Sequence, residues 1–154
     1  MERIFRILSN NKQVDLISYV RDYLKLYPET EILIGTDSQN RKENSIYAIV
    51  IGLYRPGKGA HVLYTRFNTP RISIRENSTR LLNEVWFSVE IAEVLKNELK
   101  IKAKWIDIDL NPDEQYLSNK ALTNAVGIVK GMGYEVRHKG NSPMMTYCAD
   151  HLVK

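Results

Sequence analysis

The hydrophobic pattern of this 154-residue chain changes its period once, just after Pro70. Before that residue, three apolar runs have the alternation and β-branched content of strands, with short turns between them. After it, segments with helical spacing alternate with short strand-like ones. The expected strands are residues 31–37, 45–54, 60–68, 103–110 and 134–138, and the expected helices are residues 14–27, 79–99, 117–132 and a last one from about 144.

This order predicts an α/β fold with one mixed sheet. Strands joined by short turns form an antiparallel meander, whereas strands joined through a helix lie parallel with a right-handed crossover. We therefore expect a five-stranded sheet in the order 3-2-1-4-5, flanked by helices. Residues 1–154 should form a single domain, with residues 1–28 as an N-terminal helical extension. Pro28 ends its helix, and Asn10, Asn11 or a residue close by is expected to cap it.

The composition indicates the kind of partner and the cellular compartment to expect for such a domain. The net charge of +4 and the pI near 9.1 mildly favour a polyanionic partner. Cys148 is the single cysteine, which rules out an internal disulfide and indicates a reducing, cytoplasmic location. The longest apolar stretch, residues 47–54, is far short of the roughly 20 residues that a membrane span needs.

Three aspartates stand near the ends of two predicted strands. Asp37 follows the apolar run ILIGT, and Asp107 and Asp109 alternate with isoleucines in KWIDIDLN. Alternation puts Asp107 and Asp109 on one face of their strand. The first and fourth strands should be parallel, so their C-terminal ends open on the same edge, where ligands of open α/β sheets collect. Read singly, Asp37 could instead stabilise a turn over residues 38–44, and the other two could face solvent.

Glu84 is the least expected acid in the chain. In the predicted helix 79–99 it falls inside the apolar stripe, whereas Glu90 and Glu93 fall on the polar arc. A buried carboxylate is costly unless it is paired or bound to a cation, and only Arg80 shares its face. A divalent cation would remove this cost, and a salt bridge to a distant lysine is the alternative.

Asp150, in the terminal YCADHLVK, completes the set of acids. A short last helix could place it over the same edge as Asp37, Glu84 and Asp107, although it could equally be a solvated helix residue. Four carboxylates from two strands and two helices would form a hard-oxygen site suited to Mg²⁺ or Mn²⁺. The chain has no cysteine and histidine spacing typical of zinc sites, no glycine-rich phosphate loop and no GxSxG motif.

At these residues the sequence resembles the YkuK-like family of predicted RNase H-like proteins. The stretches that carry the resemblance are IGTDSQ, RLLNEVWFSVEIAEVL, WIDIDLNP, VGIVKGMGYEVRHKG and ADHLVK. The resemblance covers most of the chain from Glu31 onward and implies a ribonuclease H-like fold. It assigns Asp37 to the first strand, Glu84 to the helix after the meander and Asp150 to the last helix. Asp107 or Asp109 supplies the acid of the fourth strand; Asp107 is preferred because WIDID aligns with the acid of the family.

The expected function is a metal-dependent nuclease. Two Mg²⁺ or Mn²⁺ ions, about 4 Å apart, would activate water and stabilise the leaving oxygen at a phosphodiester of RNA, DNA or a hybrid. Lys139, Lys154, Arg75 and Arg80 are candidates to contact the nucleic-acid backbone. Two alternatives remain open: a non-catalytic nucleic-acid-binding domain with a vestigial acid cluster, and an oligomeric protein-interaction domain. The oligomeric state itself is not predicted.

Overall fold

The computed structural model describes residues 3–70, 77–108, 115–138 and 144–153. Within them lie the strands β1 (Phe5–Ile7), β2 (Gln13–Val14), β3 (Glu31–Arg41), β4 (Asn44–Arg55), β5 (Gly59–Pro70), β6 (Trp105–Ile108) and β7 (Val136–His138), and the helices α1 (Leu16–Leu26), α2 (Asn77–Leu99), α3 (Gln115–Gly131) and α4 (Met144–Val153). None of the described helices combines the length and the apolar character that a membrane crossing requires.

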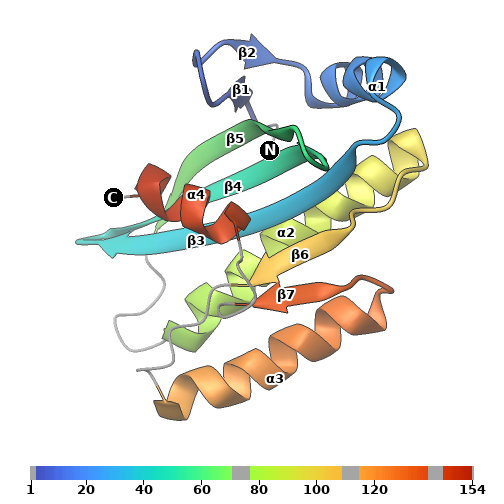
Figure 1. Cartoon of the computed structure of the whole chain (residues 1–154). Coiled ribbons are helices and arrows are strands. Elements are labelled where there is room, and N and C mark those ends of the chain that lie inside the picture. Colours follow the sequence, from blue (N-terminus) through green and yellow to red (C-terminus); the bar gives the residue numbers. More distant parts are fainter. Residues whose placement is uncertain (1–2, 71–76, 109–114, 139–143, 154) are drawn as a thin grey trace.

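The strands form one mixed sheet in the order β2-β1-β5-β4-β3-β6-β7 (Figure 1). The pairs β3–β4 and β4–β5 are antiparallel, and β3–β6 and β6–β7 are parallel. The expectation of five strands is therefore wrong: the sheet has seven, and its full order differs from 3-2-1-4-5 because β1 and β2 extend it beside β5. The five strands after residue 30 do follow the expected sequence of neighbours, and β3 and β6 lie side by side.

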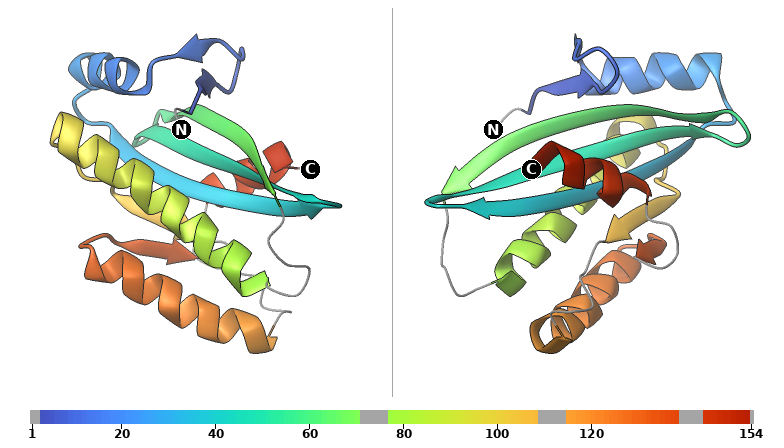
Figure 2. Two further views of the ribbon diagram at one scale, coloured as in Figure 1. Left: turned by 180° about the vertical axis from the view of Figure 1, so that it is seen from behind. Right: turned by 60° about the vertical axis from the view of Figure 1, so that its left-hand side comes forward.

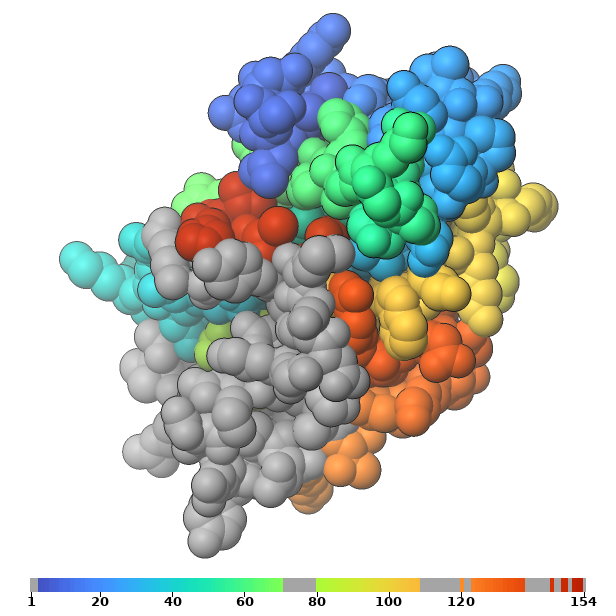
Figure 3. All heavy atoms as spheres, in the orientation of Figure 1, coloured from blue at the N-terminus to red at the C-terminus, as the bar shows by residue number. Residues whose placement is uncertain are grey.

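The N-terminal extension is a hairpin followed by a helix, and not a helix alone. The hairpin β1–β2 pairs with β5 through Arg6 and Tyr64. The helix begins at Leu16, later than expected, because Asp15 caps it: its carboxylate accepts a hydrogen bond of 3.0 Å from the Ser18 N–H. Asn10, expected near this cap, instead accepts from the Lys12 N–H inside the hairpin turn. Figure 3 shows the N-terminal residues packed against β5.

Helices cover the sheet on both faces. α2 and α3 pack on one face and α4 on the other (Figure 2). The larger core lies under α2 and includes Ile34, Ile51 and Leu95, all fully buried. The smaller core lies under α4 and includes Leu33 and Met145. Strands β3 and β4 are thus buried on both faces, which explains their nearly continuous apolar runs.

β3 continues four residues beyond Asp37, to Arg41. The predicted turn over residues 38–44 is therefore wrong for its first half. Ser38 is buried in the strand, where it pairs with Tyr47 of β4 and bonds to a side chain of α2. A polar residue is tolerated there because the neighbouring helix supplies its hydrogen-bond partner. Asp37 consequently lies inside a strand and not at its end.

Candidate functional site

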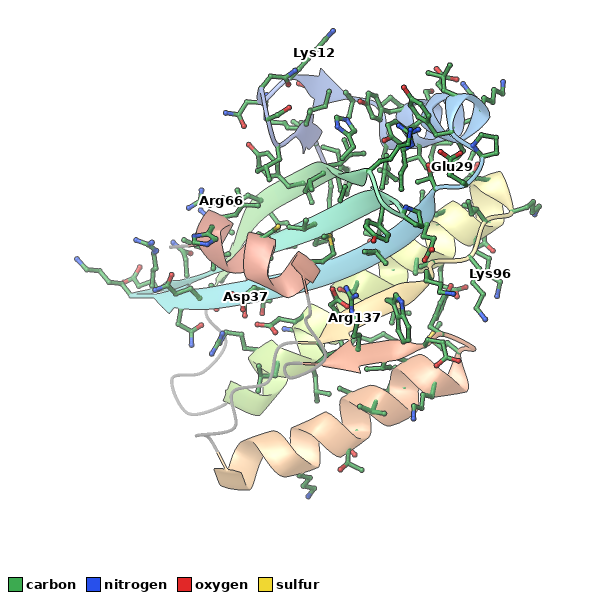
Figure 4. All side chains as sticks on the ribbon, in the orientation of Figure 1. Lys12, Glu29, Asp37, Arg66, Lys96 and Arg137 are labelled. Atoms are coloured by element: carbon green, nitrogen blue, oxygen red, sulfur yellow. The ribbon has the colours of Figure 1, made fainter. Side chains whose placement is uncertain are left out.

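The side chains of β3 alternate between the two faces of the sheet around Asp37. Thr36 Oγ1 lies 2.7 Å from Ser88 Oγ of α2, and the Ser38 hydroxyl bonds to Glu84 of the same helix. Because successive strand residues point to opposite faces, Asp37 points to the face that α4 covers. Figure 4 shows Asp37 on β3 beside α4. Asp37 is 9% exposed.

Glu84 is buried, as its position in the apolar stripe predicted, with 4% of its surface exposed. The Ser38 hydroxyl donates a short hydrogen bond to Glu84 Oε1. Arg80, one helical turn earlier, places Nη1 3.7 Å from the same oxygen and 2.9 Å from both the carbonyl oxygen and the Oγ of Ser38. The Arg80 guanidinium thus lies at the Glu84 carboxylate and ties the start of α2 to β3.

Tyr47 closes this neighbourhood on the side of β4. It lies opposite Ser38 in the strand pairing, and its hydroxyl accepts a hydrogen bond of 3.2 Å from the Asn83 amide. Burial raises the pKa of Tyr47, and the negative charge of Glu84 contributes in the same direction. The phenol therefore stays protonated at neutral pH, so that it adds no second negative charge beside Glu84.

Asp107 accepts three hydrogen bonds. Its carboxylate receives a bidentate pair of hydrogen bonds from Arg137 of β7, at 2.7 Å from Nε and 2.8 Å from Nη2. The Met145 N–H, at the start of α4, donates a third bond of 3.0 Å to Oδ2. Asp107 is 2% exposed, and its isoleucine neighbours 106 and 108 face the larger core, as alternation predicted. One carboxylate therefore joins β6, β7 and α4.

Sequence reasoning missed Arg137. It lies directly opposite Asp107 in the parallel pairing of β6 and β7, so the two side chains share one face. The alternation of β7 indicated which residues share a face, but the register that places Arg137 beside Asp107 comes only from the folded sheet.

The structure brings Asp37 and Asp107 to the same face of neighbouring strands. Asp107 pairs with Gly35, so that Asp37 lies two residues farther along β3. Glu84 approaches the same stretch of β3 from the opposite face, through Ser38. The three acids therefore lie in or beside residues 35–38 of β3. Asp37 and Asp107 are on one face of the sheet, and Glu84 is on the other.

The remaining predicted site residues lie outside the described residues. This applies to Asp109, Lys139, Lys154 and Arg75, and to the side chain of Asp150, whose backbone belongs to α4. Within the described part of the chain, no three histidine, cysteine, aspartate or glutamate side chains are grouped closely enough to hold a metal ion. The convergence of the predicted carboxylates on one metal site stays a prediction.

A family model with the description "Ribonuclease H-like" matches residues 15–154. The match begins at the cap of α1 and includes β3, α2, β6, β7 and α4, the elements that carry the buried acids and their partners. No curated protein matches the chain.

Proposed function

This chain belongs to the ribonuclease H-like family, and from that membership we propose that it binds nucleic acid and hydrolyses phosphodiester bonds with Mg²⁺ or Mn²⁺. The observation that supports this function is the identity of the buried charges. Among the described residues, the only buried charged side chains are Asp37, Glu84 and Asp107. All three are carboxylates, and all three adjoin residues 35–38 of β3.

Burying a carboxylate is unfavourable, because it loses hydration, and a paired cation or a bound metal ion must offset this cost. A protein that needed only a stable core would place apolar residues at these positions. Carboxylate oxygens are also the ligands that Mg²⁺ and Mn²⁺ prefer. The chemistry of the donor set therefore suits a divalent cation.

The acids do not suit a metal ion equally. Asp107 accepts three hydrogen bonds, and an ionised carboxylate has about four acceptor positions, so at most one position is left for a metal ion. We expect Asp37 and Glu84 to contribute ligands from the two sides of β3, with Asp107 as a ligand through Oδ1 alone or as a support for its neighbours. Asp150 and Asp109 remain proposed ligands from the sequence.

When bound, such an ion lowers the pKa of a coordinated water and neutralises charge on the phosphate. The chain itself would orient the substrate. The Arg80 and Arg137 guanidinium groups lie beside Glu84 and Asp107, and their N–H groups match the geometry of phosphate oxygens. Ser38 and the protonated Tyr47 keep the Glu84 side of the site in place through β3 and β4.

A second candidate function is nucleic-acid binding without cleavage. The bidentate contact of Arg137 with Asp107 favours it, because a cation of the protein already occupies the position that a metal ion would take on β6. Salt-sensitive binding of an oligonucleotide without metal-dependent cleavage would identify this function.

Calorimetric titration of Mn²⁺ tests the proposed site. Wild type is compared with Glu84→Gln, with Asp37→Asn, and with Glu98→Gln, an exposed acid farther along α2 that serves as the control. We expect the first two variants to lose most of the Mn²⁺ affinity and Glu98→Gln to keep it. The same proteins are then incubated with Mn²⁺ and single-stranded RNA, single-stranded DNA, duplex DNA and an RNA–DNA hybrid, and cleavage should follow the same pattern.

Equal Mn²⁺ affinity in Glu84→Gln and Glu98→Gln would remove Glu84 from the site and contradict the metal-dependent function. Binding of the oligonucleotides with no cleavage at any Mn²⁺ concentration would select the non-catalytic alternative. A mass that rises with protein concentration, together with no affinity for any nucleic acid, would favour the oligomeric interaction domain.

A further inference from the structure

A cavity of about 710 Å³ lies along the outer edge of β5, two strands away from β3 and its Asp37. β1 pairs with β5 only at Tyr64 and Leu63, through Arg6 and Ile7. The cavity occupies the space between residues 3–6 and residues 64–69, and α2 closes one side of it. Residues from both faces of β5 line it, so it follows the edge of the strand.

The charge of this cavity is strongly positive. Arg3, Arg6 and Arg66 line it, and Glu90 is the one acid among the lining residues. Glu90 is half exposed and lies 3.5 Å from Arg3, so it offsets only part of that charge. An anionic ligand fits this composition better than a cationic one.

Two aromatic rings hold the Arg3 guanidinium in place, but its Nε lacks a hydrogen-bond partner among the described residues. Its guanidinium lies 4.4 Å from the ring centre of Phe67 and 4.8 Å from that of Phe87. These rings fix the position of the guanidinium but accept little hydrogen bonding from its edge. Arg3 Nε is buried without a hydrogen-bond partner among the described residues. Because this atom is buried, a ligand oxygen would reach it only after a shift of the Arg3 side chain.

The cavity lies at the same end of the sheet as the acids. Asp37 pairs with Ala48 of β4, and Ala48 pairs with Arg66 of β5, so the three residues form one row across the sheet. Adjacent strands lie about 4.8 Å apart, which puts the backbones of Asp37 and Arg66 about 10 Å apart. Arg66 also donates a 2.8 Å hydrogen bond from Nε to the carbonyl of Leu152, near the end of α4 (Figure 4).

We propose that this arginine-lined cavity binds the phosphate backbone of a single-stranded nucleic acid. The planar N–H groups of arginine match phosphate oxygens, and three arginines along one strand edge suit a ligand with regularly repeated anionic groups. The volume is in the range of small-ligand sites, so it admits one or two nucleotides and not a double helix. The inference rests on the proposed function in taking nucleic acid as the partner, but it concerns a separate set of residues.

Fluorescence anisotropy with a labelled 12-nucleotide single strand tests this inference. The titrations are done in EDTA, so that cleavage cannot interfere. Arg6→Gln and Arg66→Gln each remove one charge from the cavity, and Arg3→Lys keeps the charge but removes the planar fork. Lys102→Gln and Lys104→Gln remove the same charge from exposed positions at the opposite end of the sheet. Circular dichroism and thermal melting confirm that each variant is folded.

We expect Arg6→Gln and Arg66→Gln to weaken binding about tenfold each. Each should also reduce the slope of log K against log salt by about 0.7, since one fewer phosphate is neutralised. The two lysine variants should change affinity little. Arg3→Lys should weaken binding although the charge is kept.

Equal losses in the arginine and lysine variants would indicate nonspecific attraction and overturn the inference. The inference is also overturned if wild type does not bind the strand. The same holds if an oligoglutamate peptide binds more tightly than the strand, or if a free mononucleotide binds as tightly as the 12-mer. Asp37→Asn separates this result from the proposed cleavage function: it should abolish cleavage in Mn²⁺ and still bind the strand in EDTA, at least as tightly as wild type, because it removes a negative charge. If the cavity variants bind and cleave the strand as wild type does, the inference that the cavity binds nucleic acid is overturned. The proposed metal site is then unaffected.

Discussion

The two faces of the sheet hold their helices in different ways. α2 lies on a large apolar core. Buried polar groups in this interface bond to one another, as Thr36 of β3 does to Ser88 of α2. α4 lies on a smaller core and is held at its ends by polar contacts. The Met145 N–H bonds to Asp107 at its start, and Arg41 and Arg66 donate to carbonyl oxygens at its end.

This difference has a physical consequence for function. Burial of apolar surface is non-directional and stabilises the α2 face broadly, whereas a polar contact depends on each partner being in place. Polar contacts at both ends of α4 make its attachment depend on charge, whereas on the α2 face the Arg80, Glu84 and Ser38 contacts add to a larger apolar core. We therefore expect changes of charge to affect the α4 face, which also carries Asp37 and Asp107, more strongly. Two of the proposed metal ligands, Asp37 and Asp107, therefore lie on the face where charged side chains also hold the helix α4.

Leucine truncation should have the largest effect and should differ between the faces. Leu53 of β4 faces the larger core and Leu33 of β3 faces the smaller one, and both are buried. We expect Leu53→Ala to lower the free energy of unfolding by about 4 kcal/mol and Leu33→Ala by about 3 kcal/mol. The smaller loss reflects repacking by the flexible Met145 side chain, which lies over Gly52 beside Leu33. Urea denaturation measures both, and a larger loss for Leu33→Ala would contradict the contrast between the cores.

Neutralising Asp107 should break the α4 face specifically. Asp107→Asn leaves Arg137 without its carboxylate and weakens the contact with the start of α4, which we expect to cost about 3 kcal/mol. Glu29→Gln is the control, because it removes the acid from an exposed arginine pair, and it should have little effect. Chemical denaturation gives the stabilities, and hydrogen exchange in α4 shows where the loss occurs. A loss spread evenly over α2 and α4 would count against a face held by charge.

The hydroxyl pair under α2 should contribute less. Thr36→Val and Ser88→Ala each leave the other hydroxyl buried without its partner, at about 1 to 2 kcal/mol. The double variant should lose about 1 kcal/mol less than the sum of the single losses. A double-mutant cycle by thermal denaturation provides this comparison. Strict additivity would mean that the two hydroxyls do not interact across the interface.

The smallest expected effect is a pH dependence on the α2 side of the sheet. His61 bonds to the Tyr19 hydroxyl and stacks on Tyr23 of α1, and burial lowers its pKa. The unfolded chain then takes up the proton more readily than the folded one. The contribution of His61 to stability is therefore full above the ordinary histidine pKa of about 6.5 and is lost as the pH falls through that value and the lower folded one.

His61→Phe keeps the ring stack but cannot titrate, so its melting temperature should fall less than that of wild type between pH 7 and pH 5.5. Melting curves across this range measure the difference. Parallel curves for the two proteins would assign the pH dependence to other groups, such as the buried acids on the α4 face.

The acids were predictable because burial leaves a mark in the pattern of a sequence. Glu84 interrupts an apolar helical stripe, and Asp107 alternates with buried isoleucines, so each indicated a carboxylate in an unusual environment. The hairpin β1–β2 was not predictable in the same way. Its strands have three and two residues, too few for a period of two to be recognised, and they exist because β5 offers an edge to pair with.

Local sequence alone determined the alternation of elements after Glu31, the adjacency of β3 and β6 and the burial of Glu84, because these depend on hydrophobic period and on short connections. The tertiary structure decided which partners the acids have. Arg137 reaches Asp107, and Ser38 reaches Glu84, over 30 and 46 residues of sequence, through a strand register in one case and a helix packed on the sheet in the other. Contacts of this kind leave no local pattern, since either partner would look like an ordinary polar residue until the sheet is formed.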